Sequence, residues 1–193
     1  MTGGSGFIGS HTCLGLLENG FQIYIIDSFI NSSKESLNKI LEILKNQGID
    51  AEGNIKLFNI DLKNERKVEA VFQEAYSNNK KIEAVIHFAG LKSVSESISE
   101  PLKYWQNNVN GTINLLKIME KFNCKTLVFS SSATVYKAKS DKLLKEDDIC
   151  FPVNPYGYTK LTIERILCDL YNSDPLNWRI VSLRYFNPVG AHY

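Results

Sequence analysis

Long apolar runs are absent from the sequence, and none of its hydrophobic stretches approaches the ~20 residues needed to cross a bilayer. The first residues are glycine and polar rather than basic and then apolar, so we expect no secretory signal and a cytoplasmic location. Basic blocks are also missing, and the formal net charge is only +1. We therefore expect neither a membrane nor a nucleic acid among the partners.

Metal-binding patterns are lacking as well. The four cysteines form neither a CxxC pair nor any other metal-ligand spacing, and we interpret them as reduced packing residues. His87 lies inside an apolar run and is interpreted as a hydrogen-bonded core residue, whereas His11 and His192 are far apart and have no carboxylate cluster beside them. We expect no metal.

The sequence does contain a regular alternation of strand-like and helix-like segments. The strand-like runs are short and rich in β-branched and aromatic residues, and they cover 21–27, 55–60, 82–89, 124–132 and 178–185. The helix-like stretches lie at roughly 6–18, 34–47, 64–79, 101–122 and 156–172. Near-continuous apolar strands alternating with helices predict an α/β fold with a doubly wound, Rossmann-like parallel sheet, in one domain over 1–193.

A glycine-rich loop opens the chain as MTGGSGFIGSHT. Gly4, Gly6 and Gly9 fit GxGxxG, while Gly3, Gly6 and Gly9 also fit GxxGxxG. In such a loop one glycine permits a tight turn, one lets the backbone approach a pyrophosphate, and one lets the helix pack close to the sheet. The N-terminus of that helix favours phosphate. The alternative, a flexible terminal tail, stays open on this motif alone.

An acidic residue follows the loop at the spacing of a dinucleotide site. Asp27 ends the next strand, 18 residues after Gly9, close to the ~20-residue offset at which a carboxylate meets the adenosine ribose. A carboxylate there repels a 2′-phosphate, so the predicted cofactor is NAD rather than NADP. A strand-terminal turn residue is the competing interpretation.

The segment NPYGYTK carries candidate acid–base chemistry. Tyr156 and Lys160 stand four apart after Pro155, which suits the first position of a helix, so both side chains should project from one face. A neighbouring cation favours the phenolate, which could exchange a proton with a substrate hydroxyl. The run 130–132, three serines, leads to the carboxyl edge of the sheet, where doubly wound folds bind ligands. Without that context, two exposed helix residues would explain YxxxK equally well.

Several motifs together resemble a known family. TGGSGFIGSHT, VIHFAGLKSV, NNVNGT, SSSATVY, NPYGYTK and LRYFNPVGAH resemble the UDP-glucose 4-epimerases, which are extended short-chain dehydrogenases/reductases. The resemblance implies Ser132, Tyr156 and Lys160 as the catalytic set, and Asn187, with Ser132 and Tyr156, as contacts of a UDP-sugar. It also implies an NAD site lined, beyond Gly3, Gly6 and Gly9, by Phe7, Ile8, Asp27, Asp61, Phe88, Ala89, Gly90, Lys92, Asn107 and Phe186.

The implied activity is the interconversion of UDP-glucose and UDP-galactose in galactose metabolism. Tyr156 would accept the proton of the sugar 4-hydroxyl while bound NAD holds the C4 hydride and then returns it to the other face. A sugar-nucleotide 4,6-dehydratase would also need an acid beside the active serine, where Ala133 and Thr134 stand. A non-catalytic NAD-binding protein remains the other alternative.

Four features depart from the family pattern. Lys137 replaces a usual glycine, and Tyr158-Thr159 replaces the usual Lys-Ser. The family also has a strand before TGG and a smaller domain after GAH that grips the uridine diphosphate. We therefore expect a sheet incomplete at both ends and a homodimer for a longer parent. Taken alone, the chain is expected to bind NAD weakly or not at all and to be inactive.

Overall fold

The structure is a computed structural model that describes residues 1–137 and 143–192. Its strands are β1 (Ile23–Asp27), β2 (Ile55–Asn59), β3 (Val85–His87), β4 (Thr126–Ser132) and β5 (Arg179–Tyr185). Its α-helices are α1 (Phe7–Glu18), α2 (Glu35–Asn46), α3 (Glu65–Ser77), α4 (Val94–Ser99), α5 (Pro101–Tyr104), α6 (Gly111–Lys121) and α7 (Pro155–Ser173). Two short 3₁₀ helices, η1 (Glu52–Asn54) and η3 (Ala133–Val135), and one π-helical segment, η2 (Trp105–Asn110), complete the helical elements of the described residues. The α/β fold with parallel strands predicted from the sequence is confirmed.

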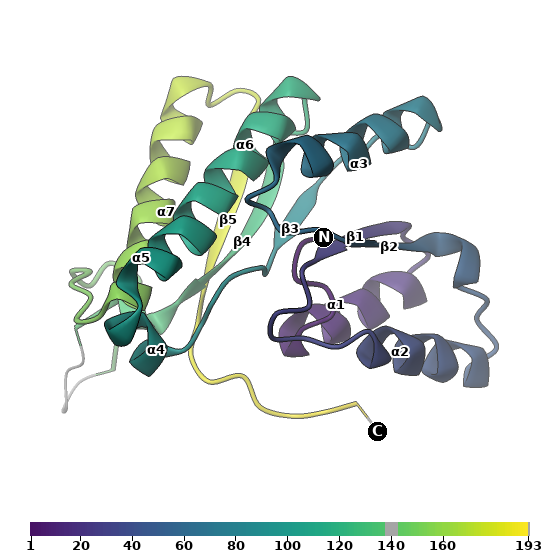
Figure 1. Cartoon of the computed structure of the whole chain (residues 1–193), viewed down its shortest axis with the longest axis horizontal. Coiled ribbons are helices and arrows are strands. Elements are labelled where there is room, and N and C mark those ends of the chain that lie inside the picture. The colour runs from purple at the N-terminus through teal and green to yellow at the C-terminus, as the bar shows by residue number, and fades with distance from the viewer. Residues whose placement is uncertain (138–142, 193) are drawn as a thin grey trace.

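The strands form two parallel groups (Figure 1). β1 pairs with β2, and β4 pairs with β3 on one side and β5 on the other. Thr2 joins the groups, since it forms parallel bridges to both Ile26 and His87. The spatial order is therefore β2, β1, Thr2, β3, β4, β5, which is the doubly wound order with Thr2 at the centre.

Two apolar cores lie around this sheet. Cys13 and Leu17 of α1 pack with Ile25 of β1 and Leu44 of α2 in one core. The other core joins α3, α6 and α7 to the opposite group of strands, around residues such as Phe129. Figure 1 shows the same division, with α1 and α2 apart from α3, α6 and α7. Helices on separate layers require strands that are apolar on both sides, which explains the near-continuous apolar runs.

The central slot of the sheet is filled by the first residues of the chain. The N–H of Gly3 donates to Ile26 and the N–H of Ile26 donates to the carbonyl of Met1, while Thr2 exchanges bonds with Ile86 and Phe88 on the other side. Without a first strand, the flanking strands would either have to pair directly or leave backbone N–H and C=O groups unpaired. The structure instead places a short stretch of extended backbone between their carboxyl ends.

The N-terminal amine lies inside this slot. It donates to the carbonyl of Tyr24 at 2.6 Å, the ladder position that a peptide N–H would occupy if the strand continued. Burial lowers its pKa from 8.0 to about 6. The slot therefore holds a group that prefers to be charged and solvated.

The predicted helix over 101–122 is divided in the structure. Pro101 begins α5, η2 is a π-helical segment, and α6 continues from Gly111. The preceding helix α4 was missed because it is short, although Ser93 caps it by accepting from the N–H of Glu96. A π-helical segment adds a residue to a turn and is frequent at functional sites.

Strand β5 is the least covered strand. Val181 and Leu183 are 51% and 38% exposed, although both are apolar. Arg184 ties the strand to α7 through a two-pronged ion pair with Glu164, whose carboxylate also accepts from Ser131. This ion pair holds the Arg184 side of β5 against α7, while Val181 and Leu183 stay exposed.

His87 is a hydrogen-bonded core residue, as predicted. Its Nδ1 lies 2.6 Å from the Thr2 hydroxyl and its Nε2 lies 2.8 Å from the Thr112 hydroxyl. Burial lowers its pKa to about 3, so the ring is neutral at physiological pH. Across 1–137 and 143–192, no cluster of three or more potential metal-binding side chains is present. The same residues include no helix that is both long and apolar enough to span a bilayer.

In a preparation of residues 1–193 that carries the free amine of Met1, stability should depend on pH. Because the pKa of this amine is 8.0 in the unfolded chain and about 6 in the folded chain, the unfolded chain binds more protons between these values. The free energy of unfolding should therefore rise as the pH goes from 6 to 8, by up to about 3 kcal/mol. Urea unfolding at both pH values measures this rise.

An engineered extension supplies the control. Adding a strand of about six apolar residues before Met1 turns the amine into a peptide N–H and fills the slot. The extended chain should be more stable, and its free energy of unfolding should no longer rise between pH 6.5 and 8. The part of the pH dependence that comes from His87, below pH 6.5, should remain. An unchanged rise in the extended chain would contradict this assignment.

Candidate functional site

A cavity of about 560 Å³ lies at the carboxyl edge of the sheet. Every site residue predicted from the sequence lines it: Gly3, Gly6, Phe7, Ile8, Gly9, Asp27, Asp61, Phe88, Ala89, Gly90, Lys92, Asn107, Ser132, Tyr156, Lys160, Phe186 and Asn187. These residues come from loops far apart in the chain. Parallel strands bring them together because their carboxyl ends meet at one edge.

The glycine loop forms one wall of the cavity. Gly3 has φ = 67°, a conformation that favours glycine, and a Cβ there would lie 2.6 Å from the N of Ala89. Gly9 is packed still more tightly, because its Cβ would lie 2.2 Å from the carbonyl oxygen of Gly3. The loop therefore uses the spacing Gly3, Gly6, Gly9, with the tight turn first and the close helix contact last.

The first turn of α1 faces the cavity with free donors. Gly6 is the N-cap residue and provides no side-chain acceptor, and the N–H of Ser10 is the donor that reaches back to Gly6. Phe7, Ile8 and Gly9 line the cavity immediately after the cap. Uncapped N–H groups at the positive end of a helix dipole suit an anion such as a pyrophosphate.

Asp27 is buried at the end of β1 and organises the adjacent loops. Its Oδ2 accepts from the N–H of Ser5 at 3.0 Å, and its Oδ1 accepts from the N–H of Phe29 at 3.0 Å and from the Ser32 hydroxyl at 2.8 Å. The carboxylate therefore links the glycine loop to the loop after β1. It also lines the cavity, where it places a negative charge.

The serines that end β4 have different partners. Ser131 donates to Glu164, so its hydroxyl is committed to the ion pair with Arg184. The Ser132 oxygen accepts from both the N–H and the hydroxyl of Thr134. With its acceptor positions engaged in this way, the Ser132 hydroxyl is left with a hydrogen to donate toward Tyr156 or a ligand.

Tyr156 and Lys160 project from one face of α7, as the spacing predicted. Pro155 occupies the first helical position and Asn154 caps the helix by accepting from the N–H of Gly157 at 2.8 Å. The Lys160 Nζ lies 5.9 Å from the centre of the Tyr156 ring and donates to the carbonyl of Ser130 at 2.8 Å. Burial lowers the pKa of Lys160 to about 8.

The expected effect of Lys160 on Tyr156 is wrong for this structure. Burial raises the pKa of Tyr156, and only a hydrogen bond with Ser132 acts in the opposite direction. Lys160 lies over the face of the ring rather than beside the phenol oxygen, and its ammonium is engaged by Ser130. The site as it stands keeps the phenol protonated.

The other predicted residues lie around the rim of the cavity. Asp61 accepts from the N–H of Lys63, and the Asn107 amide donates to the carbonyl of Lys103. Lys92 and Asn187 are exposed, and Phe186 is 64% exposed. The side of the cavity formed by these last residues is therefore open to solvent.

Sequence reasoning missed three supporting residues. Thr134 orients Ser132 and Ser32 orients Asp27; both lie a few residues beyond their partner, where hydroxyl side chains commonly bond to the preceding turn. Asn108 bonds to both the N–H and the carbonyl of Leu91, at 2.8 and 3.0 Å. No local signal marks Asn108, because its bonds depend on the π-helical segment.

The fold and the cavity define an α/β domain of the doubly wound class, with a cavity at the carboxyl edge of its parallel sheet. The family described as GDP-mannose 4,6 dehydratase matches residues 1–193, and the chain belongs to this family. Within that broad family, its similarity to the UDP-glucose 4-epimerases is confirmed by named relatives.

Two curated relatives and one solved structure illustrate this similarity. The chain is 48% identical over 192 residues to the bifunctional UDP-glucose 4-epimerase and UDP-xylose 4-epimerase 1 of Pisum sativum, covering 100% of the chain and 52% of the relative. It is also 48% identical to the UDP-glucose 4-epimerase of Bacillus subtilis, covering 100% of the chain and 53% of that relative. The UDP-glucose 4-epimerase of Bifidobacterium longum, solved in complex with NAD+ and UDP, matches with a TM-score of 0.88 and 43% identity over 99% of this chain and 53% of that one. The chain thus spans about half the length of the curated relatives it matches.

The packing of the glycine loop gives a direct test. Gly9→Ala should destabilise the chain by roughly 1 to 3 kcal/mol, because the new Cβ would overlap the carbonyl oxygen of Gly3. Gly15→Ala is the matched control in the same helix, where no atom lies within 4 Å of the added Cβ. That change should stabilise by roughly 0.5 to 1 kcal/mol. Urea unfolding of both variants should give opposite signs, and equal effects would contradict the close contact.

Proposed function

We propose that residues 1–193 form the NAD-binding domain of a UDP-glucose 4-epimerase and contribute the acid–base residues of that enzyme. The observation that carries this proposal is the meeting of the glycine loop, Asp27 and the pair Tyr156 and Lys160 around one cavity. Each group has a separate chemical task. Together they suit a dinucleotide on one side and a sugar hydroxyl on the other.

The chain's own residues support NAD as the cofactor. The uncapped start of α1 fits a pyrophosphate, and the absence of a side chain at Gly6 leaves the backbone accessible to it. Asp27 lies one strand away with its carboxylate on the cavity, which suits ribose hydroxyls and disfavours a 2′-phosphate. NAD, when bound, would supply the acceptor for the C4 hydride and return it.

Tyr156 is proposed as the group that exchanges a proton with the sugar 4-hydroxyl. Ser132 would bridge the phenol and the substrate oxygen, because its own oxygen already accepts from Thr134. Lys160 would keep positive charge beneath the Tyr156 ring and would bond to the nicotinamide ribose, exchanging its bond to Ser130. Since burial raises the pKa of Tyr156, proton transfer requires added positive charge or a stronger hydrogen bond in the loaded site.

The dehydratase alternative is less well supported. A dehydratase must protonate a leaving hydroxide, which needs an acid beside the active serine. Ala133 cannot serve, and the Thr134 hydroxyl already donates to Ser132. The named epimerase relatives point the same way.

We also propose a UDP-sugar as substrate, with Asn187 as a contact, and a cytoplasmic location. The cysteines in the described ranges are all free, which agrees with a reducing compartment. A homodimer of a longer parent is proposed from the resemblance alone, and its size in solution would test it.

Cofactor choice gives the first test. Because Met1 to Gly3 fill the central slot of the sheet, we now expect the 193-residue chain to bind NAD, and to bind it more tightly than NADP. Asp27→Ala should narrow the difference because it removes the charge that repels a phosphate. Glu42→Ala is the matched control, since it removes an exposed carboxylate of α2 that does not line the cavity. Fluorescence titration measures all three proteins. Tighter binding of NADP by the unchanged chain would overturn the cofactor assignment.

Catalysis gives the second test. Because Phe186 and Asn187 leave one side of the cavity open, the chain alone should not convert UDP-galactose. Joined to the C-terminal half of the B. subtilis relative, it should epimerise, and Tyr156→Phe should lower the rate by ~10²- to 10⁴-fold. Tyr158→Phe changes an exposed tyrosine on the same helix and should have little effect. A 4-keto-6-deoxy product would instead support the dehydratase.

A further inference from the structure

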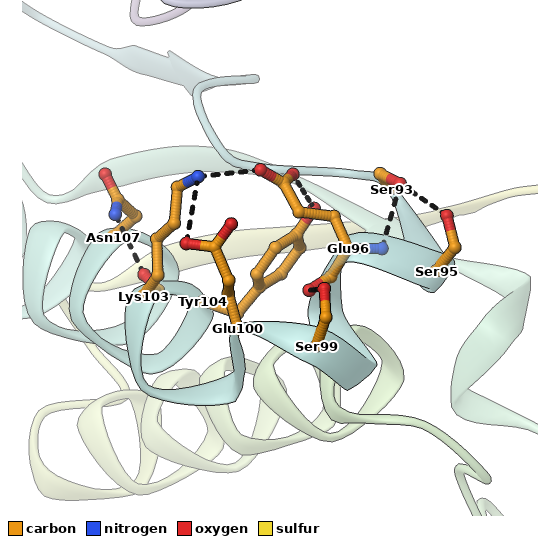
Figure 2. Close-up of polar contacts among 8 residues, drawn as sticks. All are labelled: Ser93, Ser95, Glu96, Ser99, Glu100, Lys103, Tyr104 and Asn107. Atoms are coloured by element: carbon orange, nitrogen blue, oxygen red, sulfur yellow. Dashed lines mark hydrogen bonds and ion pairs between the residues drawn. The ribbon is translucent and has the colours of Figure 1, made fainter.

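A polar cluster lies on α4 and α5 (Figure 2). Glu96 lies at its centre: its Oε1 accepts from the Lys103 Nζ at 2.7 Å, and its Oε2 accepts from the Tyr104 hydroxyl at 2.7 Å. Lys103 also lies 3.4 Å from Glu100. The Glu96 carboxylate is thus held from two directions.

The ion pairs of this cluster reach the surface, but Tyr104 does not. The side chains of Glu96 and Lys103 are 35% and 40% exposed, so their pairing is screened by water. Tyr104 is 0% exposed, and its hydroxyl is the buried end of the cluster. Burial and the bond to Glu96 raise the pKa of Tyr104 to about 12, so its hydroxyl stays a donor while an ordinary tyrosine titrates.

Tyr104 packs directly against the proposed base. The rings of Tyr104 and Tyr156 meet edge to face, with centroids 6.5 Å apart. Together with Leu91 they form a separate small apolar cluster. The backbone of Leu91 is fixed by Asn108 through two hydrogen bonds, so the surroundings of the Tyr156 ring are held by polar anchors at two points.

We propose that Tyr104, anchored through its hydroxyl to Glu96, is a positioning residue that holds the ring of Tyr156 in its orientation at the cavity. The role as a positioning residue for catalysis rests on the proposed function, whereas the mechanical link between the rings does not. A tyrosine side chain has two torsions, and an aromatic contact alone does not fix them in either partner. The Glu96 bond removes this freedom for Tyr104, and Tyr104 then limits Tyr156.

The other contacts of Tyr156 do not replace the support that Tyr104 gives to its ring. Ser132 on β4 hydrogen-bonds to its phenol, and Lys160 on its own helix lies over its face. Both are groups that a bound ligand would engage. Tyr104, in contrast, is fully buried and does not line the cavity, so a ligand in the cavity cannot displace it.

The experiment follows the ring of Tyr156 in the 193-residue chain by NMR, with ¹³C-labelled tyrosine and the Tyr156→Phe variant to assign the signal. Tyr104→Phe keeps the ring and removes only the hydroxyl, and Glu96→Ala removes its acceptor. Both should shift or broaden the Tyr156 signal. Both should also lower its titration midpoint, because looser packing admits water and weakens the effect of burial that raises the pKa of Tyr156.

Two controls separate positioning from general destabilisation. Glu96→Gln retains an oxygen that can accept from Tyr104, so it should restore the signal and the midpoint of the unchanged chain. Glu100→Gln removes only the second partner of Lys103 and should leave both unchanged. If Tyr104→Phe leaves the signal and the midpoint of Tyr156 unchanged, the proposal is overturned, even where urea unfolding shows lower stability.

This experiment uses neither NAD nor a sugar nucleotide. A chain that fails to bind NAD would refute the proposed function while the NMR result still decides whether Tyr104 positions Tyr156. Conversely, normal NAD binding together with an unresponsive Tyr156 signal would refute only the positioning role.

Discussion

The double bridge of Thr2 is the contact on which the rest of the structure depends. It joins strand groups that otherwise pack against different helices, and it sets the distance between β1 and β3. The Thr2 hydroxyl also bonds to His87, which in turn reaches Thr112 on α6. One residue at the centre of the sheet thereby connects both layers. Its backbone leads directly into Gly3, so the same bridge also positions the glycine loop that forms one wall of the cavity.

The cavity shows how polar side chains support a site before any ligand is present. Asp27, Ser132 and Leu91 each have their positions fixed by a neighbour, namely Ser32, Thr134 and Asn108. Such supporting bonds limit the freedom of groups that must meet a ligand in a defined geometry. Because these groups are already ordered in the folded chain, ligand binding costs less conformational entropy.

Charge is distributed unevenly around Tyr156. Burial raises the pKa of Tyr156 and lowers that of Lys160 to about 8, so at neutral pH the phenol is protonated while Lys160 still carries most of its charge. A proton acceptor at this position therefore depends on what the cavity contains. This behaviour differs from a simple tyrosine–lysine pair, in which the cation alone would create the phenolate. The buried edge contact with Tyr104 contributes to the same low-dielectric environment.

The sequence by itself determined the order of strands and helices, because apolar periodicity, glycine spacing and caps are local signals. Gly3 and Asp27 were found in this way, and so was the pairing of Tyr156 with Lys160 on one helix face. The family motifs extended this to further residues around the cavity, although Ser32 and Thr134, which also line it, were missed. The sequence did not reveal α4, which is short, or the π-helical segment and Asn108, whose bonds to Leu91 form only when separate segments meet.

The tertiary structure alone decided the electrostatics of the site. Spacing placed a cation near a phenol, but only the folded chain shows that Lys160 donates to Ser130 and lies over the ring. Whether a charge stabilises a neighbour depends on burial and direction as well as on separation along the chain. For the same reason the link from Glu96 through Tyr104 to Tyr156 became visible only in three dimensions: it crosses from α4 to α7, and packing rather than sequence brings those helices together.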